Sequence, residues 1–170
     1  MTATATEIIA IAILVAALLA AALSDIRRYL IPNRYPAAIV FAYLVCATGQ
    51  PLDQTLMGLA TGIVAFVLCA LLFAGGIIGG GDAKLLAATA LWAGPSLAPS
   101  FLIYTMLAGG ALALAWLSPF RHLMPAAPKQ GEPEAETGAR SSGSRLRQPT
   151  PYGAAIAAGG LYVVALRAFN

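Results

Sequence analysis

Six apolar stretches, separated by short polar or glycine-rich gaps, constrain the fold of this chain more than any other feature. Only 10% of the 170 residues are charged and 59% are hydrophobic, whereas a soluble domain has about 25% charged residues. A segment that crosses a bilayer must satisfy its own backbone hydrogen bonds, which a helix does. The sequence therefore predicts an all-α membrane protein, a polytopic bundle of about six transmembrane helices.

The predicted spans cover residues 8–23, 37–48, 56–73, 83–93 and 97–117, and a last span follows residues 151–153 and ends near Leu166. A span needs roughly 20 residues to cross a hydrocarbon core of about 30 Å. The fourth stretch rises only about 16 Å, so we expect its Asp82 end to face a water-filled recess. The third contains Gly58 and Gly62, a small-residue spacing that lets helices approach closely in lipid.

The basic residues fall on one side of the predicted spans. With six spans, that side carries all of them except Arg167: Arg27, Arg28, Arg34, Lys84, Arg121, Lys129, Arg140, Arg145 and Arg147. Positively charged loops stay in the cytoplasm, so both termini are predicted outside. No Lys or Arg precedes the first span, which argues against a signal peptide. The net charge of +3 reflects this topology, and no nucleic acid partner is expected.

Residues 118–151 differ from the rest of the chain because Pro, Gly, Ser, Glu and Arg dominate there. This composition predicts a disordered cytoplasmic loop within a single transmembrane domain covering residues 1–170. Cys46 and Cys69 lie singly in apolar spans, so we interpret them as packing residues rather than as a disulfide or zinc ligands. We expect Trp92 and Trp116 to anchor helices at the membrane interface.

Two of the seven acidic residues remain at a predicted span end on the cytoplasmic side, Asp25 and Asp82. The others lie at the outer face (Glu7, Asp53) or in the polar loop (Glu132, Glu134, Glu136). An ionisable group inside a span costs about 2.5–3.5 kcal/mol and usually has a function. Two neighbouring carboxylates share a proton, so one can activate water while the other polarises a carbonyl. This chemistry needs no cofactor and no metal, and the only histidine, His122, lies in the loop.

Simpler interpretations of these residues stay open. Asp82 follows glycines at a helix start, where capping and the helix dipole favour a carboxylate, and Asp25 could balance Arg27 and Arg28. Lys84 could tune the pair's charge, bind a substrate carboxylate or extend to the lipid headgroups. The glycine run lacks the pattern of a phosphate-binding loop.

Three motifs carry a resemblance to a known family. Gly79-Gly80-Gly81-Asp82 resembles the GxGD signature of membrane-embedded aspartic proteases, and the following Lys84-Leu85 matches its prepilin-peptidase version. Asp25 with Ile31-Pro32-Asn33-Arg34 resembles the family's first-aspartate segment, and residues 151–156 resemble the start of its last helix. The chain is thus similar to type IV prepilin peptidases. The resemblance implies the catalytic residues Asp25 and Asp82, with support from Gly79, Gly81, Lys84, Pro32, Asn33, Tyr152 and Gly153.

The resemblance also implies substrates and a location. The partners would be pilin or pseudopilin precursors in the bilayer, cleaved at the cytoplasmic face of the bacterial inner membrane. Longer members carry a cysteine-bearing insertion and methylate the new pilin N-terminus. Here nothing precedes the first span and no cysteine cluster exists, so we expect a peptidase without methyltransferase activity, like the short Flp/Tad-type members.

Three alternatives remain. The chain could be another GxGD enzyme, such as a preflagellin or signal-peptide-peptidase-like protease. It could be a proton-coupled transporter or channel subunit that uses the two aspartates as a relay, or a membrane scaffold without chemistry.

Overall fold

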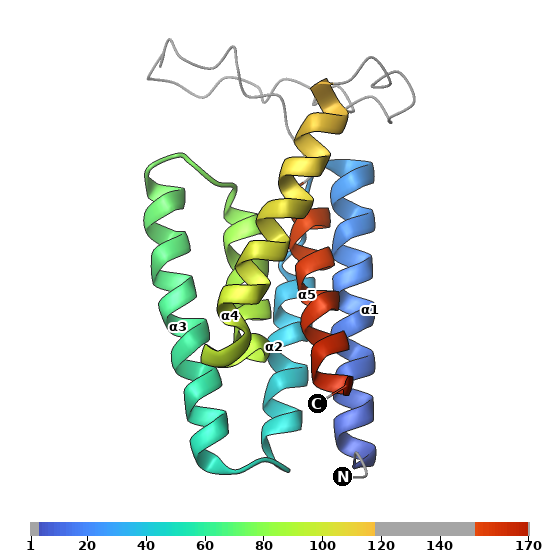
Figure 1. The fold of residues 1–170 in the computed structure, drawn as a ribbon, viewed down its shortest axis with the longest axis vertical. Coiled ribbons are helices and arrows are strands. Elements are labelled where there is room, and N and C mark those ends of the chain that lie inside the picture. Colours follow the sequence, from blue (N-terminus) through green and yellow to red (C-terminus); the bar gives the residue numbers. More distant parts are fainter. Residues whose placement is uncertain (1–3, 118–151, 170) are drawn as a thin grey trace.

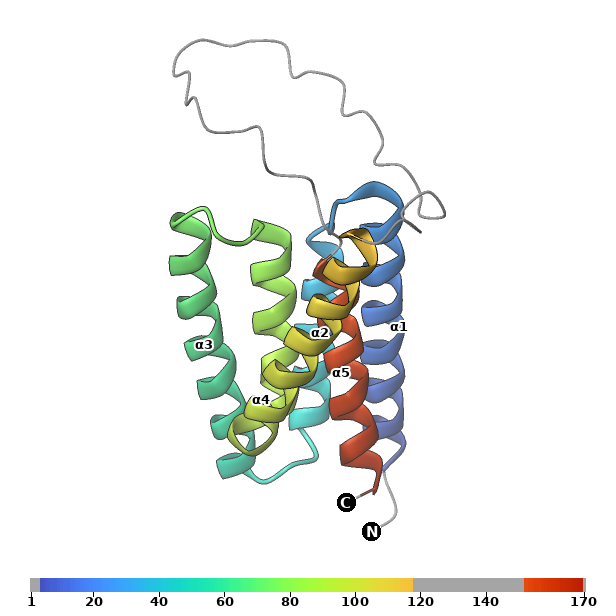
Figure 2. The same ribbon diagram turned by 45° about the horizontal axis from the view of Figure 1, so that its top comes forward.

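The computed structural model describes residues 4–117 and 152–169, and the regular structure in these ranges is entirely helical. These ranges contain five helices: α1 (Ala5–Arg28), α2 (Arg34–Ala47), α3 (Leu52–Ala74), α4 (Gly80–Leu117) and α5 (Tyr152–Phe169). They stand side by side in one bundle, and the two ends of the chain lie at the same end of it (Figures 1 and 2). The predicted all-helical class is confirmed, whereas the predicted loop 118–151 lies outside the described residues.

Helix α4 is bent back on itself at Gly94. This residue has φ 58° and ψ −178°, a conformation that is essentially restricted to glycine. Pro95 follows directly and lacks the N–H that would continue the helix. The first arm, residues 80–93, and the second arm, residues 95–117, therefore run in opposite directions (Figure 1). The fourth and fifth predicted segments correspond to these two arms.

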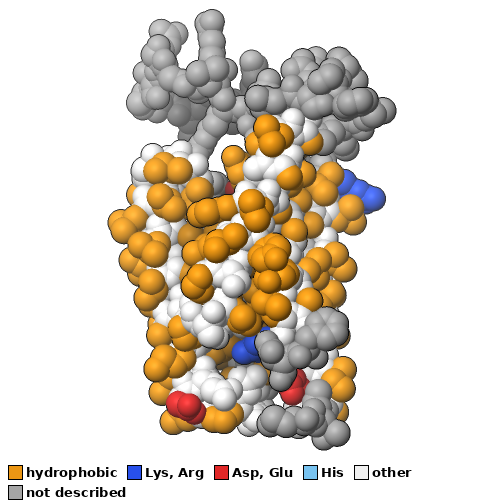
Figure 3. Space-filling model, in the orientation of Figure 1, with side chains coloured by type: hydrophobic (Ala, Val, Ile, Leu, Met, Phe, Trp, Pro, Cys, Tyr) orange, Lys and Arg blue, Asp and Glu red, His pale blue; other side chains and the backbone are white. Residues whose placement is uncertain are grey.

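The outside of the bundle is apolar along most of its length. Large hydrophobic side chains on α3, including Leu56, Ile63, Phe66 and Leu71, are more than half exposed. In Figure 3 hydrophobic side chains cover the visible face, and charged ones lie at its edge and lower end. Helices α1, α3 and α4 are long and apolar enough to cross a membrane, while α2 and α5 are shorter apolar helices. The surface thus suits lipid rather than water.

Trp92 lies in the core, although we expected it at the membrane interface. Trp92 is 1% exposed, and its Nε1–H donates a hydrogen bond to the Ile39 carbonyl oxygen of α2 at 3.1 Å. Its expected role as an interfacial anchor is therefore wrong, because the indole N–H finds its acceptor inside the bundle. The side chain of Trp116 lies outside the described residues. Cys46 and Cys69 are buried, as expected of residues that pack in the core.

The small residues of α3 allow it to lie directly on the first arm of α4. A Cβ atom at Gly62 would overlap the Leu91 side chain, and one at Gly58 would lie 2.8 Å from the Leu91 carbonyl oxygen. This close approach confirms the expectation from the Gly58–Gly62 spacing. Tyr43 of α2 reaches the same level, where its hydroxyl donates to the Thr55 carbonyl oxygen at 2.8 Å.

Candidate active site

Three chain segments that are far apart in sequence meet at the end of the bundle opposite the termini. Asp25 lies in the last turn of α1, Asp82 in the first turn of α4, and Gly153 in the first turn of α5. The corresponding helix ends lie together at the top of Figures 1 and 2. The structure therefore gathers the two aspartates and the C-terminal motif in one region.

Asp25 is held by the start of α5. Its side chain is 6% exposed, and Oδ2 accepts the backbone N–H of Gly153 at 2.6 Å. The backbone N–H of Ala154 also bonds this carboxylate. The N-terminus of a helix suits an anion because its N–H groups lack partners within the helix. Asp25 is thus bonded to α5, whereas its neighbours Arg27 and Arg28 are exposed.

The chain leaves α1 at Tyr29, which follows Asp25 by one helical turn. Tyr29 adopts a left-handed conformation with φ 52°, and its N–H donates to the Asp25 carbonyl oxygen at 2.8 Å. Burial, followed by the nearby charge of Asp25, raises the pKa of the Tyr29 hydroxyl above its usual range. The tyrosine therefore stays neutral beside the carboxylate at physiological pH.

Asp82 is half-buried and lies near Asp25. Gly81, which precedes Asp82, packs against Ile31, and so does Gly153, whose N–H bonds Asp25, so the two aspartates lie in one region although 56 residues of chain separate them. A Cβ at Gly79 would lie 3.0 Å from Asp82 Oδ2, so the carboxylate folds back over the backbone that precedes the helix. The helix dipole also favours a carboxylate in this first turn.

One residue with no predicted role, Ile31, packs between the site segments. A Cβ at Gly81 would lie 3.1 Å from Ile31 Cβ, and one at Gly153 would lie 2.6 Å from Ile31 Cδ1. Ile31 is 9% exposed, although it follows the basic end of α1. Gly81 precedes Asp82 in the chain, and Gly153 contacts Asp25 in space. Both positions suit glycine, because a side chain at either one would overlap the buried Ile31. The signals in the sequence were its place in the Ile31-Pro32-Asn33-Arg34 motif and its apolar side chain in a polar connection.

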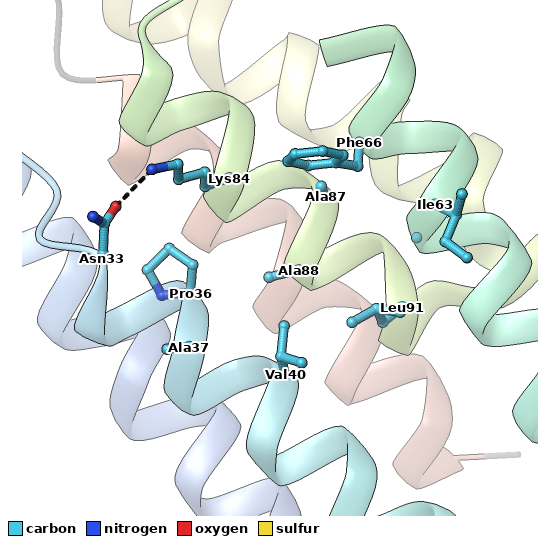
Figure 4. A pocket seen from close by; sticks show the side chains of 11 residues that line it. Asn33, Pro36, Ala37, Val40, Ile63, Phe66, Lys84, Ala87, Ala88 and Leu91 are labelled. Atoms are coloured by element: carbon cyan, nitrogen blue, oxygen red, sulfur yellow. Dashed lines mark hydrogen bonds between the residues drawn. The ribbon is translucent and has the colours of Figure 1, made fainter. Parts of the chain in front are cut away.

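The other predicted supporting residues lie around this centre. Lys84 Nζ donates to Asn33 Oδ1 at 3.0 Å and so ties α4 to the start of α2 (Figure 4). The Pro32 carbonyl oxygen accepts the Tyr35 N–H at 3.2 Å, so the chain turns at Pro32 and Asn33 before it enters α2. Tyr152 is 50% exposed and lies beside Gly109 of the second α4 arm.

The site offers carboxylates but no cluster of metal ligands. Within residues 4–117 and 152–169, no three His, Cys, Asp or Glu side chains come together in a way that could hold a metal ion. What the arrangement provides is a pair of acids from separate helices, one of them held by backbone N–H groups.

The sequence model of the type IV leader peptidase family matches residues 12–114. This match covers more than half of the chain and includes both Asp25 and Asp82, while Tyr152 and Gly153 lie beyond it. Comparison with curated proteins and with solved structures gave no significant match. Together with the apolar helices, the family match identifies the chain as a membrane peptidase that belongs to the type IV leader peptidase family, the family of the prepilin peptidases.

Proposed function

We propose that this protein is an aspartic endopeptidase that removes the leader peptide of type IV pilin-like precursors, with Asp25 and Asp82 as its catalytic pair. The observation that carries the proposal is the meeting of two carboxylates from separate helices. Asp25 is buried and Asp82 is half-buried, and the segments that hold them pack against the same residue, Ile31. An aspartic mechanism requires this arrangement, because the pair must hold one proton between them.

In the proposed reaction the ionised member of the pair takes a proton from a water molecule. The protonated member donates a hydrogen bond to the scissile carbonyl oxygen. The water oxygen attacks the carbonyl carbon and forms a tetrahedral diol. A proton then passes to the amide nitrogen, the C–N bond breaks, and the leader leaves with a new carboxyl group. One water is consumed and the shared proton returns to the pair, whose titration belongs to both residues together.

The Gly153 N–H has a positioning role in this proposal. Its bond to Asp25 Oδ2 fixes one carboxylate relative to α5, so that the pair does not depend on α1 alone. Gly79 and Gly81 help to position Asp82 by their small size: Gly79 leaves room for the Asp82 carboxylate, and Gly81 leaves room for Ile31. Lys84 and Asn33 support the start of α2 against α4.

We further propose that six helical segments cross the inner membrane of a bacterium, with α4 contributing two. The site end would face the cytoplasm and both termini would lie outside. Charge supports this orientation: Arg27, Arg28, Arg34 and Lys84 lie toward the site end, whereas Arg167 lies toward the other end with Glu7 and Asp53. The first α4 arm rises only about 21 Å, so the bilayer barrier is thin beside Asp82 and water can reach it.

This orientation suits a precursor with a polar leader in the cytoplasm and an apolar helix in the bilayer. The junction between them lies at the depth of the two aspartates and is not sealed by helical hydrogen bonds. Residues 1–170 would act as one peptidase domain. We propose a Flp/Tad-type peptidase without methyltransferase activity, because the sequence holds only two cysteines, which lie singly in α2 and α3 rather than in a cluster.

The proposal is tested by co-expressing the protein with a pilin precursor from the same genome. Asp25→Asn and Asp82→Asn should each abolish the shorter product on a gel, at unchanged protein levels. Asp53→Asn, an exposed acid at the other end of the bundle, is the matched control and should cleave normally. Cleavage of the precursor by either Asp25→Asn or Asp82→Asn would contradict the shared-proton mechanism. Proton-coupled flux in liposomes without any peptide product would favour a transporter instead.

A further inference from the structure

A groove of about 450 Å³ lies between α2 and α3, with the first arm of α4 as its floor. Figure 4 shows α2 on one side, α3 on the other and α4 between them. The residues that α4 contributes have the spacing of a single helix face; they are Lys84, Ala87, Ala88 and Leu91. Asp82 precedes Lys84 by two residues and so lies about 200° away around the helix. The groove therefore faces away from the aspartates and is separate from the candidate active site.

The groove opens to the surroundings of the bundle. Val40 on its α2 wall and Ile63 and Phe66 on its α3 wall are exposed. At one end the two walls are joined, because the Tyr43 hydroxyl of α2 donates to the Thr55 carbonyl oxygen of α3 at 2.8 Å. Since α3 and α4 are long and apolar enough to cross a membrane, the groove opens into the bilayer.

The other end of the groove carries a positive charge. Lys84 Nζ donates a hydrogen bond to Asn33 Oδ1 at 3.0 Å, and within residues 4–117 and 152–169 it forms no ion pair. A lysine ammonium has three donors, so these contacts use only one of them. Lys84 and Asn33 are the only polar side chains among the described residues that line the groove. The groove thus combines a cation at one end with a hydrocarbon lining along the rest.

The groove is narrower than a helix. Lys84 and Leu91 are two helical turns apart, so a volume of about 450 Å³ over a length of about 10 Å corresponds to a mean cross-section of about 45 Å². A helix with its side chains is about 10–12 Å wide and has a cross-section of about 80–110 Å². Extended hydrocarbon chains are much thinner than a helix. The dimensions therefore favour the acyl chains of a lipid as the occupant.

We propose that this groove binds a phospholipid with an anionic headgroup. The lipid phosphate accepts hydrogen bonds from Lys84, and the acyl chains fill the apolar part toward Leu91. Lys84 lies in the first turn of α4, where a lysine reaches the headgroup level, and the exposed Arg34 adds a second positive charge beside Asn33.

Charge complementarity favours an anionic lipid over a zwitterionic one. The described lining contains no acidic residue that could pair with the positive group of a choline headgroup, whereas Lys84 attracts a net negative headgroup. The proposal requires a bilayer but does not depend on the peptidase chemistry.

Site-specific photo-crosslinking in vesicles tests the occupant. A photoreactive residue is placed at Val40 or Ile63, on opposite walls of the groove, or at the exposed Val64 of α3, which does not line it. The vesicles contain equal amounts of phosphatidylglycerol and phosphatidylcholine with identical acyl chains, and mass spectrometry identifies the adducts. We expect the ratio of phosphatidylglycerol to phosphatidylcholine adducts to be at least threefold higher at positions 40 and 63 than at position 64, and Lys84→Gln to abolish this enrichment.

Three outcomes of this experiment would overturn the proposal. Equal ratios at all three positions would mean that only bulk lipid touches the groove. Adducts with protein at positions 40 and 63 would identify a second copy or another membrane partner as the occupant. Enrichment that persists in Lys84→Gln would show that the lysine does not select the headgroup.

Lipid titration of the purified protein, followed by native mass spectrometry, gives a second test. Lys84→Gln should weaken phosphatidylglycerol binding about fivefold, whereas Arg28→Gln, which removes an exposed charge at the same end of the bundle, should change it less than twofold. Ala37→Phe fills the groove and should weaken binding of both lipids at least fivefold. Ala60→Phe, on an exposed position of α3 outside the groove, is its matched control and should leave binding unchanged. Equal effects within either pair of variants would overturn the proposal.

Discussion

Replacing Gly153 with alanine is the sharpest test of how the site is held together. The new Cβ would lie 2.6 Å from Ile31 Cδ1, 2.8 Å from Asp25 Oδ2 and 3.1 Å from Asp25 Cβ. Ile31 is buried against Gly81 and has little room to move. The overlap is therefore relieved mainly by moving the Asp25 carboxylate, which stretches or breaks its bond to the Gly153 N–H.

The expected loss follows from that bond. A hydrogen bond to a charged group contributes about 1.5–3 kcal/mol, and each 1.36 kcal/mol of barrier changes a rate about tenfold. If Asp25 must keep its place for catalysis, Gly153→Ala should lower the cleavage rate about 10- to 150-fold. Alanine is a better helix former than glycine by about 0.5–1 kcal/mol, so the loss would not come from the helix propensity of α5.

The assay compares initial cleavage rates of a pilin precursor by purified variants at equal folded concentration. Gly110→Ala is the control, because a Cβ there has no atom within 4 Å and should leave the rate unchanged. Gly159→Ala is a second control: its Cβ would overlap Thr105 away from the aspartates, so it should reduce the amount of folded protein rather than its specific activity. A rate for Gly153→Ala within twofold of wild type would refute the positioning role of this residue.

Two further predictions concern the fold. Gly94→Ala should destabilise the protein by about 1–3 kcal/mol, because the backbone there adopts a conformation that other residues avoid, even though a Cβ would meet no neighbour; thermal unfolding in detergent, with Gly110→Ala as reference, measures the effect. Trp92→Phe removes the hydrogen bond to the Ile39 carbonyl oxygen and should lower stability by about 0.5–1.5 kcal/mol with specific activity unchanged, and equal unfolding midpoints would contradict this account.

The helices could be predicted from the sequence because each apolar stretch is bounded by charge, proline or glycine. The predicted break between residues 93 and 97 is present, because the backbone at Gly94 is non-helical and the two arms of α4 on either side of it run in opposite directions. Trp92 was misplaced because hydrophobicity alone does not say whether an indole N–H finds an acceptor in a neighbouring helix. That information depends on how α2 and α4 pack.

The site residues were chosen from motifs and from predicted membrane depth, and the structure adds how they contact one another. The Gly153–Asp25 hydrogen bond joins residues 128 positions apart, which no local pattern encodes. Ile31 entered the sequence analysis only as part of the Ile31-Pro32-Asn33-Arg34 motif, with no contact predicted for it. Its contact with both Gly81 and Gly153 arises only when three helix ends come together.

The central claim is that Asp25 and Asp82 act as one catalytic unit, and a double-mutant comparison tests it most directly. Rates of precursor cleavage are measured for Asp25→Asn, Asp82→Asn and the double variant, with unfolding midpoints as a control. Residues that work as a unit show strongly non-additive losses. We predict that each single variant loses as much activity as the double variant. Partial activity in both single variants, with losses that multiply in the double variant, would contradict a shared-proton pair.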